Sequence, residues 1–170
     1  MLESGDLIFV KDDSDIGQAI QESTGHYSHV AIFLDGKVYH ATMEGGVVCQ
    51  EPVDFFKSDR VYDICRYPGI DLKEVKKLAV SFLGAPYNAS FYPDGDGFYC
   101  SQFVAEILPI FEPIPMKFGD NMQKISDFWR DYYKELGLVV PLNQPGTNPS
   151  QLAASSLLVC KERNLYDSDF

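Results

Sequence analysis

The chain has 170 residues, and 45% of them are hydrophobic, which is enough to bury a core and predicts a single domain over residues 1–170. Its formal net charge of −11 argues against nucleic acid or an anionic bilayer as a partner, because phosphate groups would repel it. No apolar run approaches the roughly 20 residues that a membrane-spanning helix needs. These properties exclude nucleic-acid binding and a membrane span.

The first residues, MLESGDLIFV, lack a basic segment followed by an apolar one, so no secretion leader is predicted. The expected location is left open: the cell envelope or periplasm if a leader has been removed, and the cytoplasm otherwise. The four cysteines (Cys49, Cys65, Cys100 and Cys160) contain no CxxC pair. Neither a disulfide framework nor a structural zinc site is therefore expected.

The first half of the chain alternates between apolar runs and turn residues, which is typical of strands. Strands are predicted at 5–11, 28–34, 37–42, 46–50 and 60–67. One helix interrupts them, capped by Ser14 or Asp15 and ended by Gly25. The second half predicts helices at 71–84, from about residue 100, and at 125–137, with a last strand at 155–163. Sheet followed by helices indicates an α+β fold.

Cys100 lies where a loop is expected to become a helix. The preceding PDGDG segment, residues 93–97, cannot continue regular structure. Apolar residues then recur at helical spacing: Phe103, Val104, Ile107, Leu108 and Phe111. Unpaired N–H groups at a helix N-terminus favour an anion, so we expect a lowered thiol pKa and a nucleophilic thiolate near neutral pH. The alternative is an unreactive, buried cysteine that packs as a small hydrophobic residue.

Two histidines lie on strands that a hairpin is expected to join. Asp35-Gly36 is typical of a two-residue turn, and this turn sets the register of the two strands. Counting back places His29 and His40 on one face as diagonal neighbours, roughly 7–8 Å apart at the backbone. One nitrogen of His29 would then face the thiol while His40 holds the other, as a general base requires.

Other interpretations use the same histidines. Ala31 is expected opposite His40, and its small side chain would leave room for the helix N-terminus to approach that face. Without such an approach, the two rings would form a solvated polar surface. Cys100, His29 and His40 could also ligate zinc with one open position. No metal is expected, because a thiol and an imidazole suffice for chemistry and the sequence shows no outer ligand partners.

Six segments occur in the order GDLIF, YSHVAIFL, VYHAT, GAPYN, FYCSQFVAEI and PGTNPSQLAASSLL. This set resembles the circularly permuted branch of the NlpC-type papain-like cysteine peptidases, in particular the YiiX/YebB-like proteins. The resemblance implies a circularly permuted papain-like fold, with an antiparallel sheet or barrel packed against a helical part that carries the cysteine. It also implies that Cys100 is the nucleophile, His29 the base and His40 the third polar residue.

Three tyrosines are candidates for the oxyanion or substrate site, and the first of them comes from the resemblance. Tyr87 matches a tyrosine that lies near the nucleophile in NlpC-type enzymes, and it is expected to stabilise an oxyanion together with the Cys100 backbone N–H. Tyr99 stands where enzymes that cut bacterial wall peptides commonly carry an aspartate. Tyr27, two residues before His29, is a further candidate for substrate binding.

The leading hypothesis is a cysteine hydrolase that cleaves an amide bond through a thioester intermediate. Its expected substrate is a small peptide or amino-acid amide, with cell-wall material as one source. One alternative is a lipid acyl hydrolase or acyltransferase, with a lipid as its partner. The other is a binding module that holds a ligand in a papain-like cleft without turnover. No cofactor is expected, and the sequence predicts no particular oligomeric state.

Overall fold

A six-stranded antiparallel sheet forms the centre of the molecule, with the strand order β4-β3-β2-β1-β5-β8. The computed structural model describes residues 1–170. The strands of this sheet are β1 (Asp6–Lys11), β2 (His29–Leu34), β3 (Lys37–Thr42), β4 (Gly46–Gln50), β5 (Val61–Arg66) and β8 (Val159–Leu165). A separate short pair joins β6 (Ile114–Pro115) to β7 (Pro145–Gly146).

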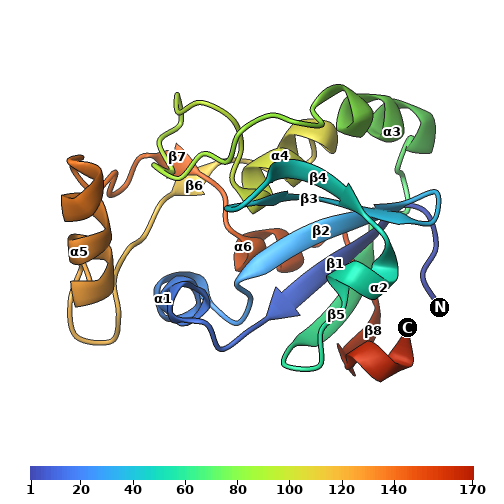
Figure 1. Cartoon of the computed structure of the whole chain (residues 1–170), viewed down its shortest axis with the longest axis horizontal. Helices are drawn as coiled ribbons and strands as arrows, with labels where there is room; N and C mark the ends of the chain where they lie inside the picture. Colours follow the sequence, from blue (N-terminus) through green and yellow to red (C-terminus); the bar gives the residue numbers. More distant parts are fainter.

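Helices cover the sheet and extend beyond it (Figure 1). They are α1 (Asp15–Thr24), α2 (Pro52–Phe55), α3 (Leu72–Ser81), α4 (Cys100–Ile107), α5 (Asp127–Leu136), α6 (Pro149–Ala153) and a short 3-10 turn, η1 (Asp167–Asp169). In Figure 1, α3 and α4 lie together on one side of the sheet, and α5 stands at the end of the molecule remote from β8. None of the helices combines the length and the apolar character that crossing a membrane requires.

The expected elements are confirmed with two adjustments. The helix predicted at 71–84 ends at Ser81, where Phe82 forms the C-cap. The last strand begins at Val159 and not at 155, because the Leu157 N–H bonds to the Ser155 hydroxyl in a turn after α6. The short helices α2 and α6 were not predicted, since segments of four and five residues carry too little periodicity to be recognised.

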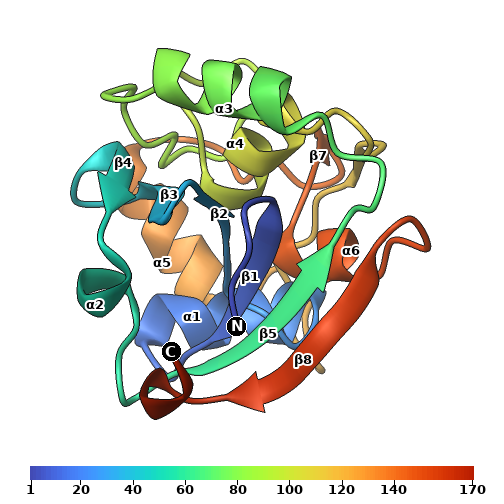
Figure 2. The ribbon, with the colours of Figure 1, turned by 90° about the vertical axis from the view of Figure 1, so that its right-hand side faces the viewer.

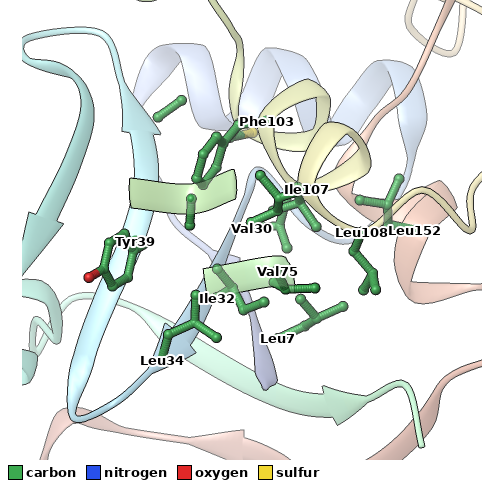
Figure 3. Packing of buried hydrophobic residues seen from close by; sticks show 14 of the residues in the cluster. Leu7, Val30, Ile32, Leu34, Tyr39, Val75, Phe103, Ile107, Leu108 and Leu152 are labelled. Carbon is green, nitrogen blue, oxygen red and sulfur yellow. The ribbon is translucent and has the colours of Figure 1, made fainter. Parts of the chain in front are cut away.

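Two apolar clusters lie on opposite faces of the sheet. On β2, Val30, Ile32 and Leu34 belong to an 18-residue cluster that includes the apolar side of α4. Figure 3 shows Val30 close to Ile107 of α4, with Ile32 and Leu34 further along the same strand. The alternate residues of β2 face the other way, toward a smaller cluster around α2. We refer to these as the α4 face and the α2 face.

This arrangement corrects one expectation. Ala31 was expected to leave room for the helix that carries Cys100, but it packs on the α2 face with Val38 and Phe55. The helix α4 covers the opposite face, because its apolar stripe matches the larger side chains of β2. The small size of Ala31 accommodates α2 and its aromatic neighbours.

The edge strand β8 is joined to β5 by a disulfide between Cys65 and Cys160. These two residues lie directly opposite each other in the β5–β8 register. Figure 2 shows β8 running alongside β5 at the margin of the sheet. The sequence predicted no disulfide framework and left this pair open, because strands 95 residues apart in the sequence give no local sign that they are neighbours.

Candidate active site

The loop before α4 places Cys100 at the first residue of the helix. Gly97 has a φ of +80°, and a Cβ there would lie 1.8 Å from the Pro86 carbonyl oxygen, so only glycine fits. The Phe98 N–H donates to the same oxygen at 3.0 Å, and Tyr87 pairs with Phe98 in an isolated β-bridge. The tyrosine-bearing segment is thereby held beside the start of α4.

The Cys100 thiol is buried, with 5% of the residue exposed. Backbone N–H groups of Val30, Ser101 and Cys100 itself favour the thiolate, but burial outweighs them and raises the pKa of the thiol to about 11. The expectation of a lowered pKa is therefore wrong for the free protein. The helix N-terminus supplies the donors that were expected, but the surrounding apolar cluster removes the water that would solvate an anion.

The hairpin prediction is confirmed. Leu34 opposes Lys37 across the Asp35-Gly36 turn. His29 Nε2 lies 2.8 Å from His40 Nδ1, and the ring centroids are 5.0 Å apart. The two imidazoles therefore share a face and contact each other, as the register predicted.

The thiol and the histidines approach β2 from different sides. Only residues 32–34 of β2 pair with β3, although β2 begins at His29. The Val30 N–H thus points at the sulfur of Cys100, on the α4 face. His29 opposes Val10, and His40 packs edge-on against Phe55, which places both rings on the α2 face. The Cys100 thiol and the imidazole pair thus lie on opposite faces near the start of β2, with no hydrogen bond between the sulfur and either ring, and neither histidine lines the pocket beside Cys100.

Gln50 completes the polar chain and was not among the residues predicted from the sequence. Its Oε1 lies 2.5 Å from His40 Nε2. Gln50 is the last residue of β4 and pairs with Val38, which puts it on the same face as His40. Counting from the Thr42–Gly46 pair in the same way as for the first hairpin would have placed Gln50 there.

Both histidines are uncharged at neutral pH. Burial is the main cause that lowers the pKa of His40 to about 4, with the Arg60 charge acting in the same direction and the Gln50 bond opposing it. Burial, followed by His40 and Arg60, holds the pKa of His29 well below 6.5. The site therefore contains a neutral thiol and a neutral imidazole, since the charged form of either group would lack water around it in this buried position.

A pocket of about 420 Å³, including its open mouth, lies beside Cys100. Its lining includes Ser28, Tyr87, Phe91, Tyr99, Cys100 and Trp129. The Cys100 backbone N–H points toward the Tyr87 hydroxyl, whose pKa burial raises well above 10. Two of the three candidate tyrosines, Tyr87 and Tyr99, are thus brought to the nucleophile.

Tyr27 is the exception. Its hydroxyl donates to the buried Asp63 carboxylate, and Lys11 lies over its ring at 5.3 Å. Tyr27 does not line the Cys100 pocket. The structure therefore does not bring Tyr27 to this pocket, and its side chain supports the packing of β1 against β5. His26 is exposed in the loop before β2.

The zinc alternative does not fit the geometry. Nowhere in the chain do three or more His, Cys, Asp or Glu side chains converge as metal ligands. His29 Nε2 and His40 Nδ1 bond to each other, so neither nitrogen is free to coordinate an ion.

The fold and site together define a class: a papain-like cysteine hydrolase in which the histidine-bearing sheet precedes the cysteine helix, as in a circular permutation. Residues 1–158 match the family described as permuted papain-like amidase enzyme, YaeF/YiiX, C92 family. The chain belongs to this family of cysteine amidases and peptidases, and β8 follows the matched region.

A solved structure agrees with this assignment at the level of the fold. The chain is similar to YiiX from Escherichia coli O157:H7, with a TM-score of 0.76 and 23% sequence identity over 95% of this chain and 97% of that one. That protein is described as a metalloprotein. No match was found among curated proteins.

Proposed function

We propose that the protein hydrolyses an amide bond in a small peptide or amino-acid amide, with Cys100 as the nucleophile and His29 as the general base. One observation carries the proposal: the thiol contacts the backbone N–H of Val30, the residue after His29, while the outer nitrogen of His29 is bonded to His40. This arrangement leaves Nδ1 as the nitrogen of His29 that can serve the thiol.

The reaction begins with two neutral groups. His29 Nδ1 removes the proton from Cys100 as the sulfur attacks the carbonyl carbon, so charge develops only during the attack. The Cys100 backbone N–H and the Tyr87 hydroxyl donate to the oxyanion. The imidazolium then protonates the leaving amine, and a thioester remains on Cys100. Water, deprotonated by His29, attacks the thioester, which releases the carboxylic acid and restores the thiol.

The residues of the pocket wall affect which substrate groups can be bound. Tyr99 occupies the position before the cysteine, and its hydroxyl accepts the Thr147 N–H at 3.1 Å. It therefore offers no carboxylate to hold a substrate amine, unlike the aspartate of wall-peptide enzymes in the related group. We propose that peptides and amino-acid amides, cell-wall fragments included, are bound through the aromatic pocket.

The test compares Cys100→Ala with Cys49→Ala, because Cys49 is the other cysteine outside the disulfide. We expect Cys100→Ala to lower kcat/KM by at least about 10³-fold on a peptide amide that the protein cleaves, and Cys49→Ala to leave it unchanged. Substrates trapped at low temperature are then identified by the mass added to Cys100. Equal activity of the two variants would refute the assignment of the nucleophile.

The same mass measurement separates the substrate classes. A peptide acyl group on Cys100 supports the proposed amidase. A fatty acyl group transferred from phospholipid vesicles would instead assign the protein to lipid acyl chemistry. Absence of any adduct or turnover over a broad panel of amides and esters would favour a ligand-binding module.

A further inference from the structure

The hydrogen-bonded chain of His29, His40 and Gln50 on the α2 face ends at the side-chain amide of Gln50. The Gln50 Oε1 that lies 2.5 Å from His40 Nε2 is a carbonyl oxygen, which accepts hydrogen bonds and cannot donate them. With the Gln50 amide in this orientation, the hydrogen between these atoms belongs to His40 Nε2. Gln50 thus determines which of the two ring nitrogens of His40 is protonated.

The consequence passes to the second ring. Since His40 is neutral and carries its hydrogen on Nε2, its Nδ1 has a free lone pair. His29 Nε2 lies 2.8 Å from that nitrogen and must supply the hydrogen of the bond. His29 is neutral as well, so its remaining nitrogen, Nδ1, is left unprotonated.

We propose that Gln50 is a positioning residue that fixes the tautomers of His40 and His29 so that His29 presents an unprotonated Nδ1 to the Cys100 thiol. The inference rests on the proposed function, in which this nitrogen takes the thiol proton. If Gln50 donated through its amide nitrogen, each hydrogen along the chain would move to the other nitrogen. His29 Nδ1 would then carry a hydrogen and could not act as a base.

The surroundings explain why a neutral acceptor stands at this position. The Arg60 guanidinium acts on both histidines and Glu44, in the β3–β4 turn, acts on His40, and these are the charged groups that influence the pair. The Phe55 ring packs edge-on at 5.0 Å from His40 and keeps water from it. An amide accepts the His40 hydrogen without drawing a second proton onto the ring, as a carboxylate would.

Two substitutions at Gln50 test the proposal. Gln50→Met keeps the length of the side chain and removes the acceptor, whereas Gln50→Glu keeps an acceptor and adds a charge. The exposed Gln144, in the loop before β7, provides the matched control Gln144→Met. The imidazole tautomers of the full chain are read from ¹⁵N NMR shifts, and kcat/KM is measured as a function of pH.

In the wild type we expect hydrogen on Nε2 of both His29 and His40. Gln50→Met should lose this single tautomer and lower kcat/KM by roughly 10- to 100-fold, while Gln144→Met changes neither. Gln50→Glu should keep the tautomer and near-normal activity at pH 8. The introduced carboxylate favours a doubly protonated His40, whose Nδ1–H would then donate to His29 and reverse the bond between the rings. As the pH is lowered, the activity of Gln50→Glu should therefore be lost at a higher pH than the activity of the wild type.

The two proposals can fail separately. Hydrogen on Nδ1 of either histidine in the wild type, or unchanged tautomers and activity in Gln50→Met, would overturn the role of Gln50 even if Cys100 proved essential. Conversely, a tautomer that depends on Gln50 in a protein with no turnover would uphold the positioning role and refute the hydrolase. A Gln50→Met chain that does not fold leaves Gln50→Glu, whose pH profile must shift, as the deciding variant.

Discussion

The two faces of the central sheet carry the two halves of the candidate site. Each face keeps its ionisable side chains uncharged, but in a different way. On the α4 face, the Cys100 thiol lies in a large apolar cluster, with only backbone N–H groups to support a charge. On the α2 face, His29 and His40 form a hydrogen-bonded chain beneath Phe55. The first face suppresses ionisation by burial alone, whereas the second also fixes where each hydrogen lies. In the mechanism proposed above, proton transfer between them accompanies substrate attack.

The sharpest way to break this comparison is to remove the base. We expect His29→Gln to lower kcat/KM by about 10³- to 10⁴-fold, because His29 is the proposed acceptor of the thiol proton. The alkylation of Cys100 in strongly alkaline solution should continue, since the α4 face is untouched. His26→Gln, in the exposed loop before β2, is the control and should retain activity. Full turnover by the His29 variant would contradict the assignment of His29 as the general base.

Packing on the two faces can be weakened one face at a time. Phe103→Ala on the α4 face and Phe55→Ala on the α2 face should each lower the free energy of unfolding by about 3–5 kcal/mol, measured by urea denaturation. Only Phe55→Ala should also raise the pKa of His40, because water then reaches the ring. The same change of pKa in both variants, followed by NMR, would show that the faces are not independent.

Acid should destabilise the α2 face before it affects the thiol. His40 has a pKa of about 4 in the folded protein, whereas an unfolded histidine titrates near 6.5. Between these values the unfolded chain binds the proton and the folded one does not, so stability falls as the pH falls from about 6.5 toward 4. The contribution is on the order of 3 kcal/mol. His40→Gln should flatten this part of the urea-denaturation profile, and an unchanged profile would argue against a buried neutral ring.

Alkali should act on the other face. Because burial raises the pKa of Cys100 to about 11, its alkylation by iodoacetamide should accelerate up to that pH. Urea-unfolded protein serves as the reference, with a thiol that titrates near 8.5. A plateau in the folded protein near pH 7 would instead indicate a thiolate stabilised by α4.

The parts of the site that the sequence predicted are those set by local rules. The Asp35-Gly36 turn fixes the strand register, and register alone brings His29 and His40 together. A glycine-broken loop before an apolar helix likewise placed Cys100 at the first helical residue. Each inference needed only the spacing of residues close in the chain.

The expectations that failed depended on packing between distant segments. The sign of the thiol pKa follows from how many apolar neighbours enclose Cys100, and these come from several elements. Which face α4 covers, and hence the role of Ala31, depends on the relative sizes of two clusters. The engagement of Tyr27 with Asp63 joins segments that no turn connects.

The hydrogen-bonded chain also has a consequence for how the protein is made. His29, His40 and Gln50 all belong to one continuous β-meander, β2 to β4, whereas Cys100 is translated about 50 residues later. Contacts between segments that are close in the chain form early, because little entropy is lost in closing short loops. On the ribosome, the hydrogen-bonded chain can therefore assemble first, and the proposed nucleophile joins it only later.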